Sequence, residues 1–418
     1  MDMVTKSATL VMNEMMQHAA EQGRPVINLG FGESGLPVLP VLRGILSDDS
    51  ARNAYPAVEG SAAVRTALSS YFTRRGIPAD PGHCLMAPGS KALLFALMQA
   101  LKGDIVLPRP SWVTYAAQST MLDKRIIWVD APESAGGVPD PALLPAALEN
   151  ARRRGLNPTT LLLTSPDNPS GTVAGRSVIE ALLRIAREQK LFIISDEIYR
   201  DLAYDHIHFT SPAELAPERT FVTTGLSKSM ALGGWRIGAA RFPQNDLGDR
   251  IMREVIGTAS EIWSGMPIFL EPVAEYCFSE PADVLKRVAA SRLLHQRVST
   301  EMHRIMVEAG ASCRAPSGAF YIYPTFQGSS FARSLDVTDD TSLSRVLFEH
   351  FGIAVLPGSA FGDLPERMGL RVVTSMIYGD SDEERLDTLY SSDPLESDSV
   401  RNGLERVRDV FLGVPSKG

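Results

Sequence analysis

Between about residue 85 and residue 240, short apolar runs alternate with stretches whose apolar residues recur every three to four positions. An apolar run bounded by polar or glycine-rich turns is typical of a buried strand, and the longer period is typical of an amphipathic helix. Strands that alternate with helices predict a mainly parallel sheet covered on both faces. The expected strands are DIVLP, RIIWVD, TTLLLTSP, KLFIISDE and RTFVTTG, and the clearest expected helix is GRSVIEALLRIAREQ.

The pattern changes near residue 290. A long helical stretch, ADVLKRVAASRLLHQRVSTEMHRIMVEAG, leads into the strand-like GAFYIYPTF and GLRVVTS, and an amphipathic helix ends the chain. The sequence therefore predicts an α/β fold with a large, doubly wound, mainly parallel sheet domain and a smaller α+β domain. We expect an N-terminal arm and the start of the small domain at 1–45, the large domain at 46–290 and the small domain at 291–418.

Composition narrows the function classes. The 418 residues are 44% hydrophobic and carry a formal net charge of -8, which suits a globular chain with a large core and argues against a nucleic-acid surface. The three cysteines are far apart and form no disulfide or metal-site spacing, so we expect a reducing compartment, the cytoplasm. The beginning of the chain lacks the order of a signal peptide, and no apolar stretch reaches the roughly 18 residues of a membrane helix.

One glycine-rich turn satisfies the G-x-G-x-x-G pattern through Gly30, Gly32 and Gly35. A dinucleotide site needs a helix to begin there, because the helix amino end holds the pyrophosphate. Pro37 and Pro40 interrupt the following residues, so we expect a flexible turn instead. Its backbone N–H groups could still hold a carboxylate.

Polar side chains stand where three of the predicted strands end. Asn168 lies in the turn PDNPSG, Asp196 ends a strand with Tyr199 three residues on, and Lys228 follows a third strand. Because the carboxyl ends of parallel strands meet at one edge, we expect the four side chains to gather there. Asn168 could simply form a turn and Asp196 a helix cap. A buried lysine is harder to explain structurally, since burial removes its proton and leaves a nucleophile toward carbonyls.

These groups match the needs of pyridoxal phosphate, which requires a lysine for its aldehyde carbon, a carboxylate for its ring nitrogen and donors near its phenolic oxygen. Asp196 suits the nitrogen, and Asn168 and Tyr199 suit the oxygen. The cofactor's phosphate also needs a cradle, which the start of a helix supplies. The residues expected to hold the phosphate or stack on the ring are Gly89, Ser90, Lys91, Ser227, Arg236 and Trp112.

The lysine segment GLSKSMALGGWRIG carries a resemblance that extends over nearly the whole chain. With INLGFGE, PGSKALLFAL, SPDNPSGTV, SDEIYR, PSGAFYIYP and GLRVVTS, it makes the chain similar to the fold-type I, class I/II aminotransferases of the aspartate aminotransferase superfamily. The resemblance implies the pyridoxal-phosphate transferase fold, pyridoxal 5'-phosphate as cofactor, small amino acid and 2-oxo acid substrates, and a homodimer with shared active sites.

The resemblance also implies a role for each matching residue. Lys228 carries the cofactor as an internal aldimine and, with Asp196 and Tyr199, is catalytic. The implied cofactor-binding residues are Gly89, Ser90, Lys91, Trp112, Asn168, Asp196, Tyr199, Ser227, Lys228 and Arg236, with Tyr55 reaching the phosphate of the neighbouring subunit. The implied substrate-binding residues are Gly30, Arg371, Asn168 and Trp112, and Arg371 grips the α-carboxylate.

Some positions depart from the family pattern or suggest other chemistry. Gly225 stands where a phosphate-binding serine is common. Glu261 and Trp263 are unusual in the segment ASEIWSGMPIFLEP, and we hypothesise that they shape the pocket for the substrate side chain; the alternative is that they pack the dimer interface. His206 and His208 form an H-x-H pair without further ligands nearby, so we expect a surface loop and no metal site.

The resemblance favours an aminotransferase that moves an amino group from an L-amino acid to a 2-oxo acid by a ping-pong mechanism. Two alternatives stay open. An enzyme of the same fold could use the cofactor for elimination, decarboxylation, oxidation or carbon–carbon bond formation, because the orientation of the scissile bond decides the reaction. A non-catalytic sensor domain that binds the cofactor is the second alternative.

Overall fold

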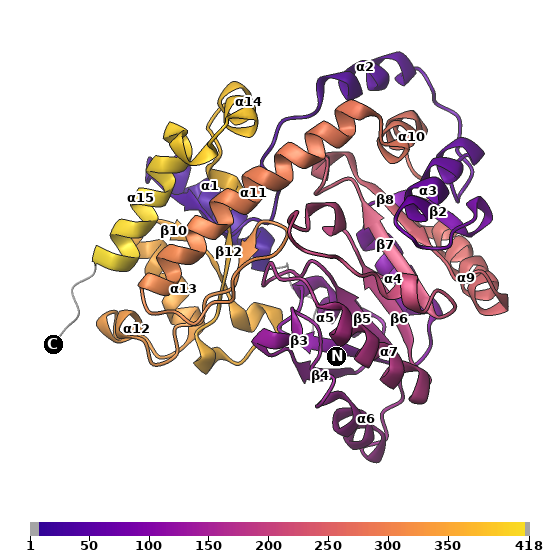
Figure 1. Ribbon diagram of the computed structural model, residues 1–418, viewed down its shortest axis with the longest axis horizontal. Coiled ribbons are helices and arrows are strands. Elements are labelled where there is room, and N and C mark those ends of the chain that lie inside the picture. The colour runs from indigo at the N-terminus through magenta and orange to yellow at the C-terminus, as the bar shows by residue number, and fades with distance from the viewer. Residues whose placement is uncertain (1–7, 414–418) are drawn as a thin grey trace.

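The computed structural model describes residues 8–413, and a seven-stranded sheet forms the centre of its larger part (Figure 1). The strand order is β2-β8-β7-β6-β5-β3-β4, and β8 is antiparallel to both of its neighbours. The predicted mainly parallel sheet is therefore confirmed. Its strands are β2 (Cys84–Pro88), β3 (Asp104–Arg109), β4 (Ile126–Asp130), β5 (Pro158–Thr164), β6 (Phe192–Asp196), β7 (Thr220–Gly225) and β8 (Ile237–Arg241).

Strands β2 and β8 were not among the expected strands. The sequence of β8, IGAAR, is made of small residues and lacks the run of branched apolar residues typical of a buried strand. The packing explains this composition, because a Cβ atom on Gly238 would lie 2.2 Å from the backbone carbon of Gly89. Strand β8 therefore keeps small residues to let the segment before α4 (Ser90–Ala100) approach its backbone.

Helices cover both faces of the sheet, as the alternating pattern predicts. Successive residues of β3 point to opposite faces: Ile105 and Leu107 join one apolar cluster, and Val106 joins another. The first cluster includes α4, α5 (Val113–Met121) and α9 (Asp246–Ile262). The opposite face is covered by α3 (Ala62–Arg74), α6 (Leu144–Arg153), α7 (Arg176–Glu188) and α10 (Glu271–Ser279).

The C-terminal part has its own apolar cluster, to which residues of the N-terminal segment contribute. Its antiparallel sheet has the order β11-β12-β9, and β1 pairs with β10. The expected strand GAFYIYPTF is much shorter in the structure, where β9 is two residues long. The elements are β1 (Ile27–Asn28), β9 (Tyr321–Ile322), β10 (Ile353–Ala354), β11 (Leu356–Pro357), β12 (Leu370–Val373), α11 (Ala282–Glu308), α12 (Ser330–Ser334), α13 (Asp340–Phe351), α14 (Asp382–Tyr390) and α15 (Asp398–Gly413).

The predicted division at 45 and 290 stays a prediction. Helix α11 is continuous across residue 290, so the change of composition there falls inside one helix. The expected N-terminal arm includes residues 1–7, which lie outside the described residues. From Ala8 to Glu21 the chain forms helix α1, whose Met12 and Met16 pack against a cluster of its own chain that contains Phe361.

The G-x-G-x-x-G pattern lies in the segment between β1 and α2 (Pro40–Asp49), and the conformation of this segment shows whether a helix begins there. Residues 29–39, all of them described, contain no helix, as the two prolines predict. The segment instead runs along the C-terminal sheet, where the backbone N–H of Val373 donates to the carbonyl of Leu29 at 2.9 Å. The glycines therefore lie between the two parts of the molecule.

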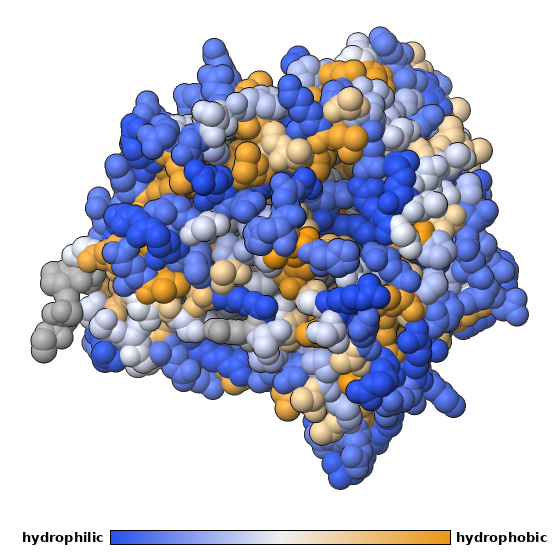
Figure 2. Space-filling model, in the orientation of Figure 1, coloured by the Kyte–Doolittle hydropathy of each residue, from blue (hydrophilic) through white to orange (hydrophobic). Residues whose placement is uncertain are grey.

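On the side that Figure 2 shows, hydrophilic side chains surround scattered apolar ones. Within residues 8–413, none of the helices combines the length and the apolar character that crossing a membrane requires.

Candidate active site

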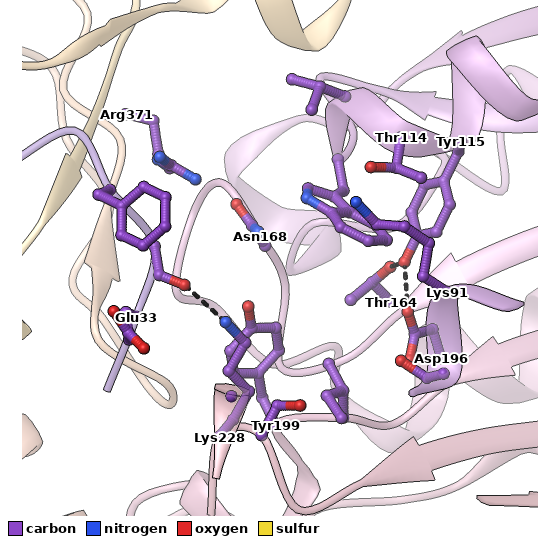
Figure 3. A pocket seen from close by; sticks show the side chains of 18 of the residues that line it. Glu33, Lys91, Thr114, Tyr115, Thr164, Asn168, Asp196, Tyr199, Lys228 and Arg371 are labelled. Carbon is purple, nitrogen blue, oxygen red and sulfur yellow. Dashed lines mark hydrogen bonds between the residues drawn. The ribbon is translucent and has the colours of Figure 1, made fainter. Parts of the chain in front are cut away.

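A cavity of about 480 Å³ opens at the carboxyl ends of β5, β6 and β7 (Figure 3). Parallel sheets place their ligands at this edge, because the strands end there and the connecting turns leave space. The four strand-end residues predicted to gather do line this cavity. The site residues expected from the sequence that line it are Ser90, Lys91, Trp112, Asn168, Asp196, Tyr199, Ser227, Lys228, Arg236 and Arg371.

Lys228 lies just beyond β7, and its amino group points into the cavity. Its Nζ atom donates to the carbonyl oxygen of Gly32 at 2.6 Å. Burial, helped by the positive charge of Arg371, lowers the pKa of Lys228 to about 8, while Glu33 opposes the shift. A sizeable fraction of this amine is therefore neutral near pH 8, the form that attacks a carbonyl carbon.

Asp196 ends β6 and forms one wall of the cavity with little exposure to solvent. The Tyr115 hydroxyl donates to its Oδ2 atom at 2.8 Å, and the Thr223 hydroxyl donates to its Oδ1 atom at 3.2 Å. Burial raises the pKa of Asp196 to about 6, and these two donors act against burial. The carboxylate is fixed in orientation and suited to accept a hydrogen bond from a protonated ring nitrogen.

Tyr199 and Asn168 line the same cavity as Lys228 and Asp196. The hydroxyl of Tyr199 is 2.7 Å from the hydroxyl of Tyr321. Oδ1 of Asn168 is buried and has no hydrogen-bond partner among the described residues. A buried polar atom without a partner is costly, so a polar ligand group is expected beside Asn168.

Cationic and backbone donors gather at the other end of the cavity, around the start of α4. The 11-residue helix presents its free N–H groups there, and Lys91 extends over the Trp112 ring with its Nζ atom 5.2 Å from the ring centre. Gly89 has φ +90, and a Cβ atom there would lie 2.2 Å from Nη2 of Arg236. The missing side chain therefore lets the guanidinium lie against the helix start, which together form an anion cradle.

Arg371 belongs to β12 and reaches the cavity from the C-terminal sheet. Its side chain is 1% exposed, and its Nη2 atom donates to the carbonyl oxygen of Gly30. The Nε atom of Arg371 has no partner among the described residues, so the guanidinium retains donor capacity for a carboxylate. Burial lowers the pKa of Arg371 from its ordinary value.

Three of the expected site residues, all within the part of the chain that the structure describes, do not line the cavity. Gly89 and Gly30 stand behind it, in contact with Arg236 and Arg371 respectively. Tyr55 is 91% exposed, so within one chain it contacts no part of the cavity.

Sequence reasoning missed several residues that the structure places at or beside the cavity. Gly32 rather than Gly30 lines it, and Tyr115, Thr164 and Tyr321 form the hydrogen bonds around Asp196 and Tyr199. Tyr115 lies three residues after Trp112 at the start of a helix, a spacing that could have placed both on one side. The other missed lining residues are Leu10, Phe31, Glu33, Val113, Thr114, Ile198 and Gly233.

The segment 259–272 lies away from the cavity of its own chain. Trp263 packs against the core cluster of α4 and α9, and its Nε1 atom is buried without a partner in the described residues. Glu261 is exposed and accepts from Ser260 at 3.4 Å. The hypothesis that Glu261 and Trp263 shape a substrate pocket therefore depends on a second subunit.

The two histidines of the H-x-H pair, His206 and His208, are exposed in a loop. Within residues 8–413 there is no group of three or more His, Cys, Asp or Glu side chains arranged to hold a metal ion.

The cavity is lined from the large, mainly parallel sheet and, through Arg371, from the smaller C-terminal sheet, and it gathers the groups of an enzyme active site. The sequence model of the family described as aminotransferase class I and II matches residues 24–376. The chain therefore belongs to this family and is an aminotransferase.

Individual relatives agree with this assignment. The aspartate/prephenate aminotransferase of Thermus thermophilus is 31% identical over 372 residues, covering 85% of this chain and 89% of the relative. The corresponding enzyme of Cereibacter sphaeroides is 30% identical over 378 residues, covering 87% and 90%. The solved structure of the Rhizobium meliloti aspartate aminotransferase has a TM-score of 0.81 at 25% identity and covers 98% of this chain and 97% of its own.

Proposed function

We propose that this aminotransferase uses pyridoxal 5'-phosphate, attached to Lys228, to move an amino group from an L-amino acid to a 2-oxo acid by a ping-pong mechanism. The observation that supports the proposal most is the meeting of a buried lysine, a buried carboxylate and an anion cradle in one cavity. Few small molecules need an amine, a carboxylate and a phosphate site at these three positions, and this cofactor is one.

The residues present fit the cofactor group by group. Ser90, Lys91, Ser227 and Arg236, with the start of α4, hold the phosphate. Asp196 accepts from the ring nitrogen and Tyr199 donates to the phenolic oxygen. The Nδ2 group of Asn168, which lines the same cavity, would donate to that oxygen as well, and Trp112 would stack on the ring. When bound, the cofactor supplies an electron sink for the substrate's α-carbon.

The chain's own groups then perform the proton transfers. As a free amine, Lys228 has a pKa of about 8 and would both accept and return a proton near neutral pH. Arg371 binds the substrate's α-carboxylate and so fixes the α-carbon beside Lys228. Asp196 keeps the ring nitrogen protonated throughout.

The substrates and the assembly are part of the same proposal. Relatives named for aspartate and prephenate make aspartate the first donor to test here. We place the enzyme as a homodimer in the cytoplasm, with the exposed Tyr55 completing the phosphate site of the partner subunit. Glu261, in the last turn of α9, and Trp263, directly after this helix, belong to the same expected interface.

The decisive test is an absorption scan of the purified protein with bound pyridoxal 5'-phosphate, before and after amino acids are added without an acceptor. We expect the visible band to convert to the pyridoxamine form with one 2-oxo acid released per site. Lys228→Ala should still fold and bind the cofactor, with turnover reduced by more than about a thousandfold.

Two results would contradict the proposal. Turnover of Lys228→Ala near the wild-type rate would remove the lysine from the mechanism. Continuous consumption of an amino acid without an acceptor would mean that the same site carries out elimination, decarboxylation or another alternative reaction.

A further inference from the structure

A hydrogen bond between two phenols connects the two parts of the molecule beside the cavity. The hydroxyls of Tyr199, after β6, and Tyr321, in β9, are 2.7 Å apart, and their rings meet edge to face at 83° with centres 5.4 Å apart. Both side chains are almost fully buried, at 3% and 0% exposure. The contact therefore links the position of Tyr199, on the wall of the cavity, to that of Tyr321 in the C-terminal sheet.

Tyr321 also contacts the arginine that we assign to the substrate carboxylate. The Cζ atom of Arg371 is 5.4 Å from the centre of the Tyr321 ring. Strands β9 and β12 pair with Tyr321 opposite Val373, so Arg371, two positions earlier, lies on the same face as a diagonal neighbour. Gly32 closes this corner, since a Cβ atom there would lie 2.9 Å from the Tyr321 hydroxyl.

The chemistry of a phenol sets the direction of the hydrogen bond. A hydroxyl has one proton to donate, so Tyr199 can donate to the cofactor only if it accepts from Tyr321. Burial raises the pKa of both phenols, well above the ordinary value for Tyr199 and to about 12 for Tyr321, and the charge of Arg371 opposes the rise in both. Both hydroxyls are therefore protonated near neutral pH and able to donate.

We infer that Tyr321 is a positioning residue that links Arg371 to Tyr199. Through Tyr321, neutralisation of the Arg371 charge by a bound carboxylate changes the hydrogen bond that Tyr199 gives to the cofactor's phenolic oxygen. A free Arg371 makes Tyr321 a stronger donor, and a carboxylate bound to Arg371 cancels that effect. Binding of the substrate's α-carboxylate thus weakens the Tyr199 hydrogen bond. The inference rests on the proposed function, because it assumes the cofactor and the role of Arg371.

The test is the pH at which the bound cofactor's visible band changes, a spectroscopic pKa that needs no turnover. Donation to the phenolic oxygen stabilises its negative charge and holds this pKa down. Tyr321→Phe should therefore raise the band's pKa by roughly 0.5 to 1 unit, the size of one hydrogen bond. Propionate, a carboxylate that cannot react, should raise the pKa in the wild type and raise it less in Tyr321→Phe.

A double-variant cycle separates a positioning role from a general disturbance. If Tyr321 acts through Tyr199, Tyr321→Phe should change the band's pKa little when Tyr199 is already Phe. The matched control is Tyr323→Phe, which removes a partly buried hydroxyl two residues further on that donates to Asp363 at 2.8 Å and does not line the cavity. Its band should have the wild-type pKa and the wild-type response to propionate.

Several outcomes would overturn the inference. An unchanged pKa in Tyr321→Phe would do so, as would an equal change in the presence and absence of the Tyr199 hydroxyl. If Tyr321→Phe does not fold, Tyr199→Phe alone decides, because a full propionate response in that variant excludes the relay. A wild-type protein that forms no visible band with the cofactor would instead defeat the proposed function, and the inference with it.

Discussion

At the scale of single residues, the site depends on side chains that are absent as well as on those present. Gly32 lies where the N-terminal segment meets the cavity, and its carbonyl oxygen accepts from Lys228 at 2.6 Å. A Cβ atom on Gly32 would lie 2.9 Å from the Tyr321 hydroxyl and 3.2 Å from Nη1 of Arg371. Both neighbours are buried and cannot move away freely.

We therefore predict that Gly32→Ala raises KM for the amino acid substrate about tenfold, because overpacking of about 1 to 3 kcal/mol displaces the carboxylate-binding arginine. Steady-state kinetics would measure this. Gly44→Ala is the control, since the Cβ atom it adds has no heavy atom within 4 Å, and it should leave KM unchanged. Equal KM values for Gly32→Ala and the wild type would show that Arg371 does not occupy this position when substrate is bound.

At the scale of elements, the turn after β5 holds Asn168 in place through its neighbour Asp167. The Asp167 carboxylate accepts from the backbone N–H of Ser170 at 3.0 Å and from its hydroxyl at 2.5 Å. The backbone N–H of Gly171 donates to the Asp167 carbonyl oxygen at 2.9 Å, which closes the turn. Asp167 is 1% exposed, and burial raises its pKa from 3.8 to about 7.

This shift makes stability depend on pH. Between about pH 4 and pH 7 the folded chain keeps the Asp167 proton that the unfolded chain has released, so stability falls as pH rises through this window. At pH 8 the buried, ionised Asp167 therefore lowers the free energy of unfolding, by roughly 1 to 3 kcal/mol. We predict that Asp167→Asn removes this pH-dependent loss. Urea unfolding from pH 4 to pH 8 measures it. Asp48→Asn, an exposed position, should keep the wild-type profile, and an identical slope for Asp167→Asn would contradict the prediction.

At the scale of the whole molecule, large apolar side chains are exposed on the segments that we propose as the dimer interface. Tyr55 is 91% exposed and Ile262 is 63% exposed. Their segments meet, because a Cβ atom on Gly265 would lie 2.7 Å from Cγ of Pro56. Exposed aromatic and apolar side chains on two segments that meet are typical of an interface.

Hybrid dimers test whether Tyr55 completes the partner's site. Tyr55→Ala and Lys228→Ala are each expected to have little activity, but a dimer with one subunit of each kind contains one intact site. An equal mixture after unfolding and refolding should regain about a quarter of wild-type activity, since half of the dimers are hybrids with one working site in two. Activity that stays at the average of the two separate variants would show that each site is built within one chain.

The sequence predicted the features that neighbouring residues determine, and it missed those that depend on residues far apart along the chain. Lys228, Asp196 and Asn168 were found because each stands at the end of a strong apolar run, a signal contained in a few neighbouring residues. The five expected strands of the large sheet were found for the same reason. Strand β8 was missed because its small residues carry no strand signal of their own. They are required by the close approach of the backbone at Gly89, almost 150 positions earlier.

The sequence by itself determined the alternating layers, the edge at which the site lies and the chemical groups that a pyridoxal-phosphate site needs, because local pattern and side-chain chemistry are enough for these. Only the tertiary structure decided that Gly32 lines the cavity, that Tyr115 holds Asp196 and that Tyr321 joins Tyr199 to Arg371. Tyr199 and Tyr321 are 122 positions apart. Their contact is fixed by how the C-terminal sheet packs against the large sheet, and no local pattern along the chain encodes that packing.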